Sequence, residues 1–266
     1  MERLILIETS TALCSAAICE KGGIIAYRES DAPKSHASLT AVFIDEMLKG
    51  NGLQLAECDG VCVSMGPGSY TGLRVGVSTA KGLCFGGGLP LLAVGTLDTL
   101  VAQAVAQGAV QCRRPDGTAV EMPVENFTHI VPMIDARRME VYTGVFSRRD
   151  PGMDSGMSSG LDSGLDSGGH LRFLQTTETE PHIVTPESFR EHLAEGPVLF
   201  IGDGALKCAD AITSPNAFFL QCCPKASSMA VPATEAFRKK EFRDVAYFEP
   251  FYLKEFTATV SRKKLF

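Results

Sequence analysis

The sequence lacks several features that would point to whole classes of protein. It contains no tryptophan, and no apolar run approaches the roughly 20 residues that a membrane-spanning helix needs. Its net charge of −6 leaves no basic field over the whole molecule, which argues against a protein that binds nucleic acid on its own. The opening residues MERLILIETS lack the basic segment and the longer apolar core of a secretion signal. These absences favour a globular protein of the cytoplasm.

Disulfide and metal-site patterns are also missing, although nine cysteines are present. Their number is odd, and Cys222 and Cys223 are adjacent rather than spaced as a CxxC pair. Most of the others, such as Cys14, Cys62 and Cys84, lie inside apolar runs. We therefore expect reduced cysteines packed in the core of a cytoplasmic protein.

What the sequence does contain is an alternation of strand and helix patterns that predicts an α/β fold. Hydrophobic residues make up 45% of the 266 positions, enough for a sizeable core. Strands are expected at 3–9, 14–20, 24–30, 60–65, 89–95, 129–135, 139–146, 171–176, 198–204 and 217–221, and helices at 36–50, 96–107, 186–194, 205–212 and 226–242. A further helix follows the glycine-rich loop near residue 66. The order β-β-β-α-β-α-β-α recurs, which indicates two similar lobes, each a mixed sheet flanked by helices.

Three parts follow from this order. We expect an N-terminal lobe at 1–107, a C-terminal lobe at 108–225, and a helix and tail at 226–266 that pack back on the N-terminal lobe. An insertion at about 149–169 repeats Asp-Ser-Gly units, which bury too little apolar surface to offset the entropy of ordering, so we expect it to be flexible. A second irregular stretch is expected at 112–127.

The stretch SMGPGSYTGLRVGVSTAKGL, residues 64–83, has two interpretations. Gly66 and Gly68 would let backbone N–H groups at a helix N-terminus cradle a phosphate, although the Lys-Ser/Thr signature of a P-loop is absent. Alternatively, the glycines serve a helix built for close packing. Gly76 in mid-helix costs about 1 kcal/mol against alanine, which is most easily explained if another backbone comes close. One face of this helix is apolar, and Gly72, Gly76 and Thr79 form a second, flat face.

The helix at 36–50 is apolar around most of its circumference. The residues concerned are Leu39, Ala41, Val42, Phe43, Ile44, Met47 and Leu48. Such a helix needs two packing partners, of which its own sheet is one. The other is either a different subunit or a further layer of the same lobe, and periodicity alone favours neither.

Three segments resemble the TsaB (YeaZ) family. MGPGSYTGLRVGVSTAKGL, which follows a strand ending in IETST, carries most of the resemblance. MIDARRMEVYTGVF at 133–146 and FEPFYLKEF at 248–256 resemble two further segments of that family, and the resemblance spans nearly the whole chain. It implies two lobes of the actin/Hsp70/sugar-kinase type. It also implies a partner subunit of the complex that makes N6-threonylcarbamoyladenosine at position 37 of tRNAs reading ANN codons.

The resemblance implies partners and an interface as well. The expected partner is TsaD, bound as a heterodimer through two helices of the first lobe, with self-association as a homodimer an alternative. A TsaE-type ATPase would join the complex, tRNA would be met only through it, and no membrane is expected. The implied interface residues are Leu39, Val42, Phe43, Met47, Gly72, Gly76 and Thr79. The implied nucleotide contacts are Thr9, Ser10, Gly66, Gly68, Gly202 and Gly204.

Catalysis by this chain is not expected. The TsaD relatives bind a metal through an HxxxH pair, whereas this sequence has His36 with Thr40 at the second position. Glu8 stands where relatives often carry Asp, which weakens the case for metal–phosphate chemistry there. We therefore expect no catalytic residue, no metal and no cofactor of its own, with ATP or ADP at a subunit interface. Asp135 and Arg137 could form an ion pair at the hinge. The alternative function is a small-molecule kinase or nucleotide hydrolase of the same superfamily.

Overall fold

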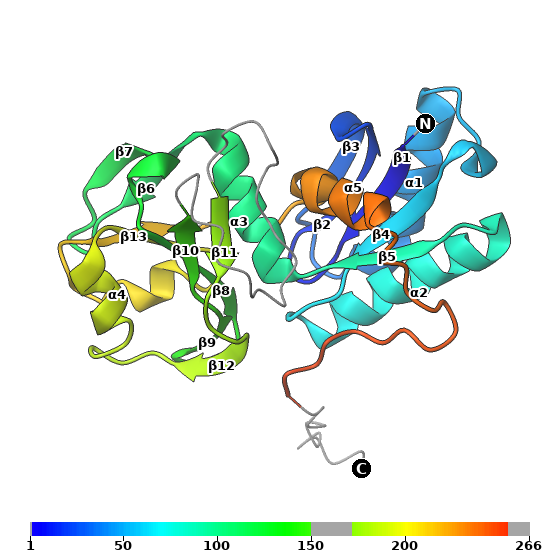
Figure 1. Cartoon of the computed structure of the whole chain (residues 1–266). Helices are drawn as coiled ribbons and strands as arrows, with labels where there is room; N and C mark the ends of the chain where they lie inside the picture. The colour runs from blue at the N-terminus through cyan, green and yellow to red at the C-terminus, as the bar shows by residue number, and fades with distance from the viewer. Residues whose placement is uncertain (1, 150–171, 255–266) are drawn as a thin grey trace, which may run out of the picture.

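Two mixed β-sheets, one in each lobe, organise the chain (Figure 1). The computed structural model describes residues 2–149 and 172–254. The predicted Asp-Ser-Gly insertion lies outside these residues, apart from its first position, and so does the end of the tail. Within the described residues, the predicted two-lobed α/β class is confirmed.

The first lobe contains a five-stranded sheet in the order β3-β2-β1-β4-β5. Its elements are β1 (Arg3–Glu8), β2 (Cys14–Glu20), β3 (Gly23–Ser30), α1 (His36–Gly50), η1 (Leu55–Glu57), β4 (Gly60–Ser64), α2 (Tyr70–Gly87) and β5 (Leu91–Val94). The strands β1, β4 and β5 run parallel, and the meander β1-β2-β3 is antiparallel. The five strands and α1 lie where the sequence predicts them, to within two residues at each end, and α2 follows the glycine-rich loop as expected. The short turn η1 was not predicted.

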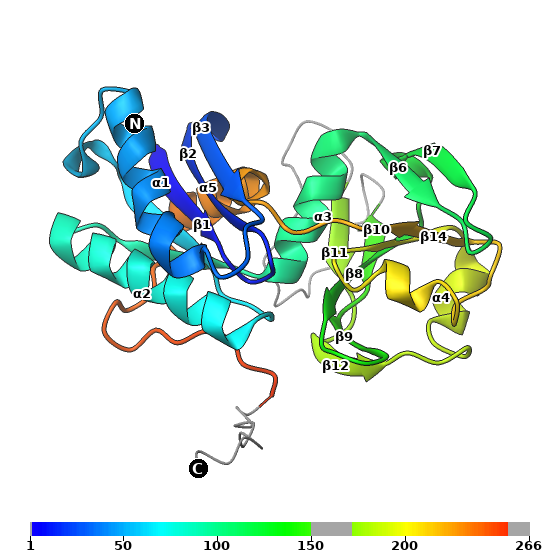
Figure 2. The same cartoon turned by 180° about the vertical axis from the view of Figure 1, so that it is seen from behind.

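Helices cover both faces of this sheet. Figure 2 shows α1 and α2 on one face, where Ile44, Met47 and Val77 pack with the sheet residues Ile5 and Ile7. The opposite face is covered by η4 (Ala226–Met229) and α5 (Ala230–Arg238), whose small side chains pack against β1 and β4. The polypeptide therefore returns to the first lobe after completing the second.

The second lobe contains a sheet of nine strands in the described residues, with the path β11-β10-β8-β13-β14-β6-β7. Its elements are β6 (Ala109–Arg113), β7 (Ala119–Pro123), η2 (Val124–Asn126), β8 (His129–Asp135), β9 (Glu140–Thr143), β10 (Phe146–Arg149), β11 (Arg172–Gln175), β12 (Glu180–Ile183), α4 (Arg190–Glu195), β13 (Val198–Ile201), η3 (Leu206–Cys208) and β14 (Ala217–Leu220). The strands β8, β13 and β14 are parallel and lie at its centre.

Several second-lobe predictions are wrong. The stretch 112–127, expected to be irregular, contains the β6–β7 hairpin, whose turn carries Asp116 and Gly117. The single strand expected at 139–146 is divided into β9 and β10, which pair with opposite ends of β8. The helix expected at 205–212 is only the short 3-10 turn η3. Short apolar runs with turn residues do not distinguish these forms by periodicity, so tertiary packing decides them.

Two predicted helices have different bounds in the structure. The helix expected at 186–194 begins only at Arg190, because the backbone of Phe189 is left-handed at φ 60° and Pro186 lies in the preceding turn. The helix expected at 226–242 is η4 followed by α5 and ends at Arg238.

The helix α3 (Thr96–Gln107) lies between the lobes in both cartoon views (Figures 1 and 2). Its apolar residues Leu97, Leu100, Val101 and Ala104 belong to the second-lobe core. On its other side, Gln103 donates a hydrogen bond to the carbonyl of Cys223 at 3.2 Å, in the strand-to-helix segment that returns to the first lobe. This helix therefore joins the two sheets.

Candidate functional site

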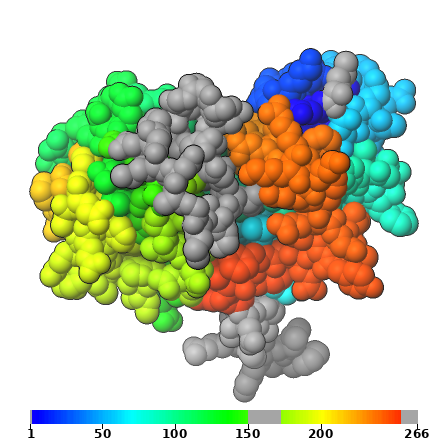
Figure 3. Space-filling model, viewed as in Figure 1, coloured from blue at the N-terminus to red at the C-terminus, as the bar shows by residue number. Residues whose placement is uncertain are grey.

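A cleft of about 630 Å³ lies between the two lobes. The first lobe contributes the β1–β2 turn, His36 and the N-terminus of α2, and the second contributes the end of β8, Tyr142 and Asp203. The remaining wall is the C-terminal segment 251–254. The full set of residues that line the cleft is Ser10, Thr11, Ala12, His36, Gly68, Ser69, Tyr70, Thr71, Ile134, Asp135, Ala136, Arg137, Tyr142, Asp203, Phe251, Tyr252, Leu253 and Lys254. Figure 3 shows this segment in red, lying against both lobes.

Of the six nucleotide-contact candidates, some line the cleft and others do not. Ser10 and Gly68 line the cleft. Thr9 does not, because it is fully buried beneath α2. Gly66, at φ 106°, is covered by the C-terminal segment, since a Cβ there would lie 2.8 Å from the carbonyl oxygen of Phe251. These two residues therefore pack within the chain, and neither lines the cleft.

Gly202 and Gly204 lie one layer behind the cleft. Both approach the carbonyl of Met133, to which the N–H of Gly204 donates a hydrogen bond at 3.0 Å. Between them, Asp203 lines the cleft itself and accepts a hydrogen bond from the N–H of Asp135 at 2.9 Å. The two glycines therefore position Asp203 and do not line the cleft themselves.

The end of β1 places an unusual carboxyl group under the cleft. Glu8 is completely buried, and burial raises the pKa of this carboxyl to about 7. One oxygen, Oε1, accepts a hydrogen bond from the backbone N–H of Ser10 at 2.7 Å. Because burial disfavours the charged form, this position is a poor ligand for a cation at neutral pH unless it first loses a proton.

His36 and Thr40, which stand at the two positions of an HxxxH pair, do not form a pair of metal ligands. The His36 ring nitrogen Nε2 lies 2.9 Å from the carbonyl oxygen of Thr11. Thr40 is buried, and its hydroxyl donates to the carbonyl of His36 at 2.7 Å. Across residues 2–149 and 172–254, no group of three or more His, Cys, Asp or Glu side chains is arranged to hold a metal ion.

The glycine-rich stretch packs against the chain's own β1–β2 turn. Three glycines at spacing four, Gly68, Gly72 and Gly76, face Ser10, the carbonyl of Thr9 and the hydroxyl of Thr9 in turn. A Cβ at any of the three would lie far inside van der Waals contact. The Thr9 hydroxyl also donates a hydrogen bond to the carbonyl of Gly72 at 2.8 Å. The close backbone inferred at Gly76 is therefore found at Gly68 and Gly72 instead, while Gly76 meets the Thr9 side chain, and all these neighbours belong to this chain.

This packing corrects four of the seven interface candidates. Gly72 and Gly76 are buried against the β1–β2 turn, and Phe43 and Met47 lie in the core beneath α1. None of the four is accessible to a partner. Sequence periodicity assigns residues to a face of a helix correctly, but it does not say which face is turned outward.

The other three candidates lie closer to the surface. Val42 is 44% exposed on α1, Thr79 lines a groove on the outer side of α2, and Leu39 is partly buried against the core. The groove has a volume of about 520 Å³ and is lined by Ala37, Tyr70, Thr71, Arg74, Val75, Ser78 and Thr79. Most of these side chains are small, so another helix could approach α2 closely along this face.

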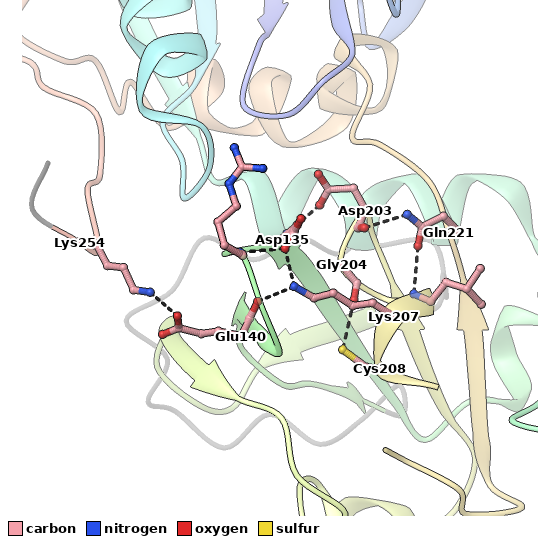
Figure 4. A network of polar contacts seen from close by, with 10 residues as sticks. Asp135, Glu140, Asp203, Gly204, Lys207, Cys208, Gln221 and Lys254 are labelled. Atoms are coloured by element: carbon pink, nitrogen blue, oxygen red, sulfur yellow. Dashed lines mark hydrogen bonds and ion pairs between the residues drawn. The ribbon is translucent and has the colours of Figure 1, made fainter. Parts of the chain in front are cut away.

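A network of polar contacts fixes the second-lobe wall of the cleft (Figure 4). Lys207 forms an ion pair with Asp135 and donates a hydrogen bond to the carbonyl of Glu140 at 2.7 Å. Burial raises the pKa of the Asp135 carboxyl, but Lys207 and the Arg137 N–H outweigh it and hold that pKa below its usual value. Asp135 therefore pairs with Lys207, rather than with Arg137 as expected. Arg137 donates its backbone N–H to Asp135 at 2.9 Å.

The sequence did not identify the aromatic part of the site. Tyr70, Tyr142 and Tyr252 line the cleft, and Tyr252 comes from a segment that the sequence identifies only as a closing tail. The tail motif YLKEF contains Tyr252 and Lys254, so its resemblance to a family segment was the available signal.

Comparison with known proteins decides the family. A family model described as TsaD, tRNA N6-adenosine threonylcarbamoyltransferase, matches residues 11–260. The chain is 32% identical over 151 residues to the tRNA threonylcarbamoyladenosine biosynthesis protein TsaB of Escherichia coli, covering 57% of this chain and 58% of that protein. The TsaB of Haemophilus influenzae is 34% identical over 139 residues, or 52% and 51% of the two chains. This chain belongs to the TsaB/YeaZ family.

A solved structure supports the same fold. A Pseudomonas aeruginosa protein, described as uncharacterized with similarity to peptidase YeaZ, aligns with a TM-score of 0.72 at 22% identity. The alignment covers 96% of the TsaB-family chain and all of the P. aeruginosa chain. In sequence, the chain spans little more than half the length of the curated TsaB relatives it matches. None of the helices in the described residues is long and apolar enough to cross a bilayer.

Proposed function

We propose that the chain is a non-catalytic partner subunit in the formation of N6-threonylcarbamoyladenosine in tRNA. In this role it binds a threonylcarbamoyltransferase of the TsaD type through the outer face of α1 and α2. The TsaB relatives are named for this biosynthesis, and the matching family model is named for the transferase. ATP or ADP, a TsaE-type ATPase and tRNA would be met in the assembled complex.

The observation that carries the proposal is the uncovered outer face of the two helices. Val42 is 44% exposed on α1 and Phe85 is 88% exposed on α2, although both are large apolar residues. On the outer side of α2 the groove presents Ala37, Val75 and Ser78 to solvent, with Arg74 as its single charged residue. Apolar side chains around a groove of this kind are typical of a surface that receives a helix of a partner protein.

The cleft supports a role other than catalysis. It contains the buried Glu8 beneath its floor in place of an exposed carboxylate, and Asp135 is paired with Lys207. The third carboxyl, Asp203, accepts a hydrogen bond from the N–H of Asp135, and burial raises its pKa, which disfavours the charged form. A phosphoryl-transfer enzyme needs carboxylates free to hold a metal ion at the phosphates. The described residues of this cleft favour binding over phosphoryl transfer, which weighs against the kinase or hydrolase alternative.

Binding to the host's TsaD protein tests the interface. Ser78→Arg places a long charged side chain in the groove, so we expect TsaD binding to weaken by about 100-fold, equivalent to about 2.7 kcal/mol. The matched control is Ile183→Arg, at an apolar residue that is 69% exposed on the second lobe, and it should leave binding unchanged. Unchanged binding by Ser78→Arg, or an equal loss in the control, would contradict the proposed surface. Loss of a homodimer without any TsaD binding would assign the groove to self-association.

Reconstitution tests the non-catalytic role. The purified chain should neither modify tRNA nor hydrolyse ATP at a useful rate. Addition of TsaD, the carbamoyl-adenylate synthase and the ATPase subunit should give modified tRNA, and omission of this chain should reduce the product. Robust modification or ATP hydrolysis by the chain alone would refute the proposal and favour the enzyme alternative.

A further inference from the structure

The C-terminal segment 246–254 lies along α2 and then crosses the interlobe cleft. Lys81 on α2 donates hydrogen bonds to the carbonyls of Ala246 and Phe248, each at 3.0 Å. The N–H of Phe251 then donates to the carbonyl of Met65 at 2.7 Å. These bonds hold the first part of the segment on the first lobe.

The last described residue of the segment reaches the second lobe. Lys254 forms an ion pair with Glu140 of β9, and its ammonium group lies 5.8 Å from the centre of the Tyr142 ring. The segment therefore links the two lobes while lining the cleft, and Figure 3 shows its red atoms lying against both lobes. Both Lys254 and Glu140 are partly solvent-exposed, so this tie is weak and easily shifted.

The same segment contacts the helix that carries the proposed partner surface. The Tyr252 ring lies 4.9 Å from the Tyr70 ring, and the Arg74 guanidinium lies 4.3 Å from the centre of the Tyr70 ring. The Arg74 side chain also hydrogen-bonds the side chain of Tyr252. Tyr70 and Thr71 line both the cleft and the α2 groove, whereas Arg74 lines only the groove and Tyr252 only the cleft. The stack of Arg74, Tyr70 and Tyr252 thus connects the two surfaces through direct contacts.

We propose that binding of a partner in the α2 groove seats the C-terminal segment across the cleft, through the Arg74–Tyr70–Tyr252 stack. The inference rests on the proposed partner function and specifies its regulation. A docked helix removes water from Arg74 and Tyr70, and a cation–π contact is stronger when it is desolvated than when it is exposed. The stronger stack holds Tyr252 and with it the segment. Because coupling between two sites is reciprocal, a released segment must weaken partner binding by the same factor.

Hydrogen–deuterium exchange with and without TsaD tests the coupling. We expect amide exchange in residues 249–254 to slow when TsaD is bound. Tyr252→Ala should remove that slowing and weaken TsaD binding by about fivefold, at the low end of measured allosteric couplings. The matched control is Tyr247→Ala, at a tyrosine of the same region that is 85% exposed and lies outside both the cleft and the groove. The control should change neither readout.

The outcomes separate this inference from the proposed function. If TsaD binds the wild-type chain but exchange in 249–254 is unchanged, the coupling is refuted and the partner function stands. If Tyr252→Ala binds TsaD as tightly as the wild type does, the coupling is likewise refuted. If TsaD does not bind the wild-type chain, the partner function and the coupling both fail.

Discussion

Replacing Gly76 with alanine should destabilise the folded chain, and Thr9→Ala should reverse the effect. The added methyl group would point at the hydroxyl of Thr9, far inside van der Waals contact. That hydroxyl is held in place by its hydrogen bond to the carbonyl of Gly72 at 2.8 Å. The turn between β1 and β2 and the helix α2 must therefore move apart, or the hydrogen bond must break.

The expected magnitude follows from three contributions. Overpacking a closely packed site costs about 1–3 kcal/mol. Loss of the hydrogen bond from Thr9 adds about 1 kcal/mol, and the better helix propensity of alanine returns about 1 kcal/mol. The net loss is about 2 kcal/mol in the free energy of unfolding, or a decrease in melting temperature of about 6 °C for a chain of this size.

A double-mutant cycle measures the contact directly. In the Thr9→Ala background the nearest remaining atoms are the Val63 methyl group at 3.4 Å and the Thr9 Cβ at 3.5 Å, which are ordinary packing distances. Gly76→Ala should then stabilise the chain by about 1 kcal/mol through helix propensity, so the cycle should show a coupling of about 3 kcal/mol in chemical denaturation. Gly72→Ala is the control, because its methyl group would meet the backbone carbonyl of Thr9, which no side-chain change removes.

Two results would refute this reasoning. If Gly76→Ala melts like the wild type, the turn is not packed against α2 as described. If it melts normally but fails to bind TsaD, the glycine face is a partner surface after all.

Three further predictions concern stability. Burial raises the pKa of the Glu8 carboxyl from 4.5 to about 7, so its protonation stabilises the folded chain fully below pH 4.5, and this stability is lost as the pH rises through 7. Glu8→Gln should therefore be more stable than the wild type at pH 8, by on the order of 3 kcal/mol in urea unfolding, and should show no gain at pH 4. Val77→Ala, at a residue only 4% exposed in the first-lobe core, should cost about 2 kcal/mol in thermal melts and leave TsaD binding unchanged; lost binding with normal stability would mean that Val77 faces the partner. Replacing residues 150–169 with a short Gly-Ser turn should change the melting temperature by less than about 5 °C, since Arg149 and Arg172 are paired neighbours on β10 and β11; a larger decrease would show that the insertion packs.

The strands and helices of the first lobe could be predicted from the sequence more closely than those of the second, because their signals lie in the local sequence. The strands β1 and β2 and the helix α1 have strong apolar patterns with Gly22, Gly23 and Ser35 at their ends, so pattern and turn chemistry agree. In the second lobe, β9 and the start of β10 lie in one strand-like stretch of sequence, 139–146, and the division between them arises because they pair with different parts of β8. Pairing between distant segments leaves no periodic signal in either one.

The cleft was only partly predictable for the same reason. Ser10 and Gly68 line the cleft, and the glycine-rich strand-to-helix turn that carries Gly68 is recognisable in the sequence. Tyr252 and Lys254 come from the far end of the chain and enter the site only because the tail crosses back over α2. The ion pair between Lys207 and Asp135 spans 72 positions, and each residue alone has the appearance of an ordinary surface charge.

The glycine-rich helix shows what periodicity leaves undetermined. Spacing correctly grouped Gly72 with Gly76 on one face and Leu73 with Val77 on another, and all four are buried. A second backbone does approach the glycine face, at Gly72 rather than at Gly76, where the Thr9 side chain lies. A helix on a sheet meets two neighbours within its own lobe, the strands below and the β1–β2 turn beside it. The side that we propose to face the partner is then the one left over, which contains Val75, Ser78 and Thr79 and has no distinctive composition. A docking surface made of small, half-exposed residues carries no periodic signal of its own, so it emerges only after the internal contacts of every other face have been assigned.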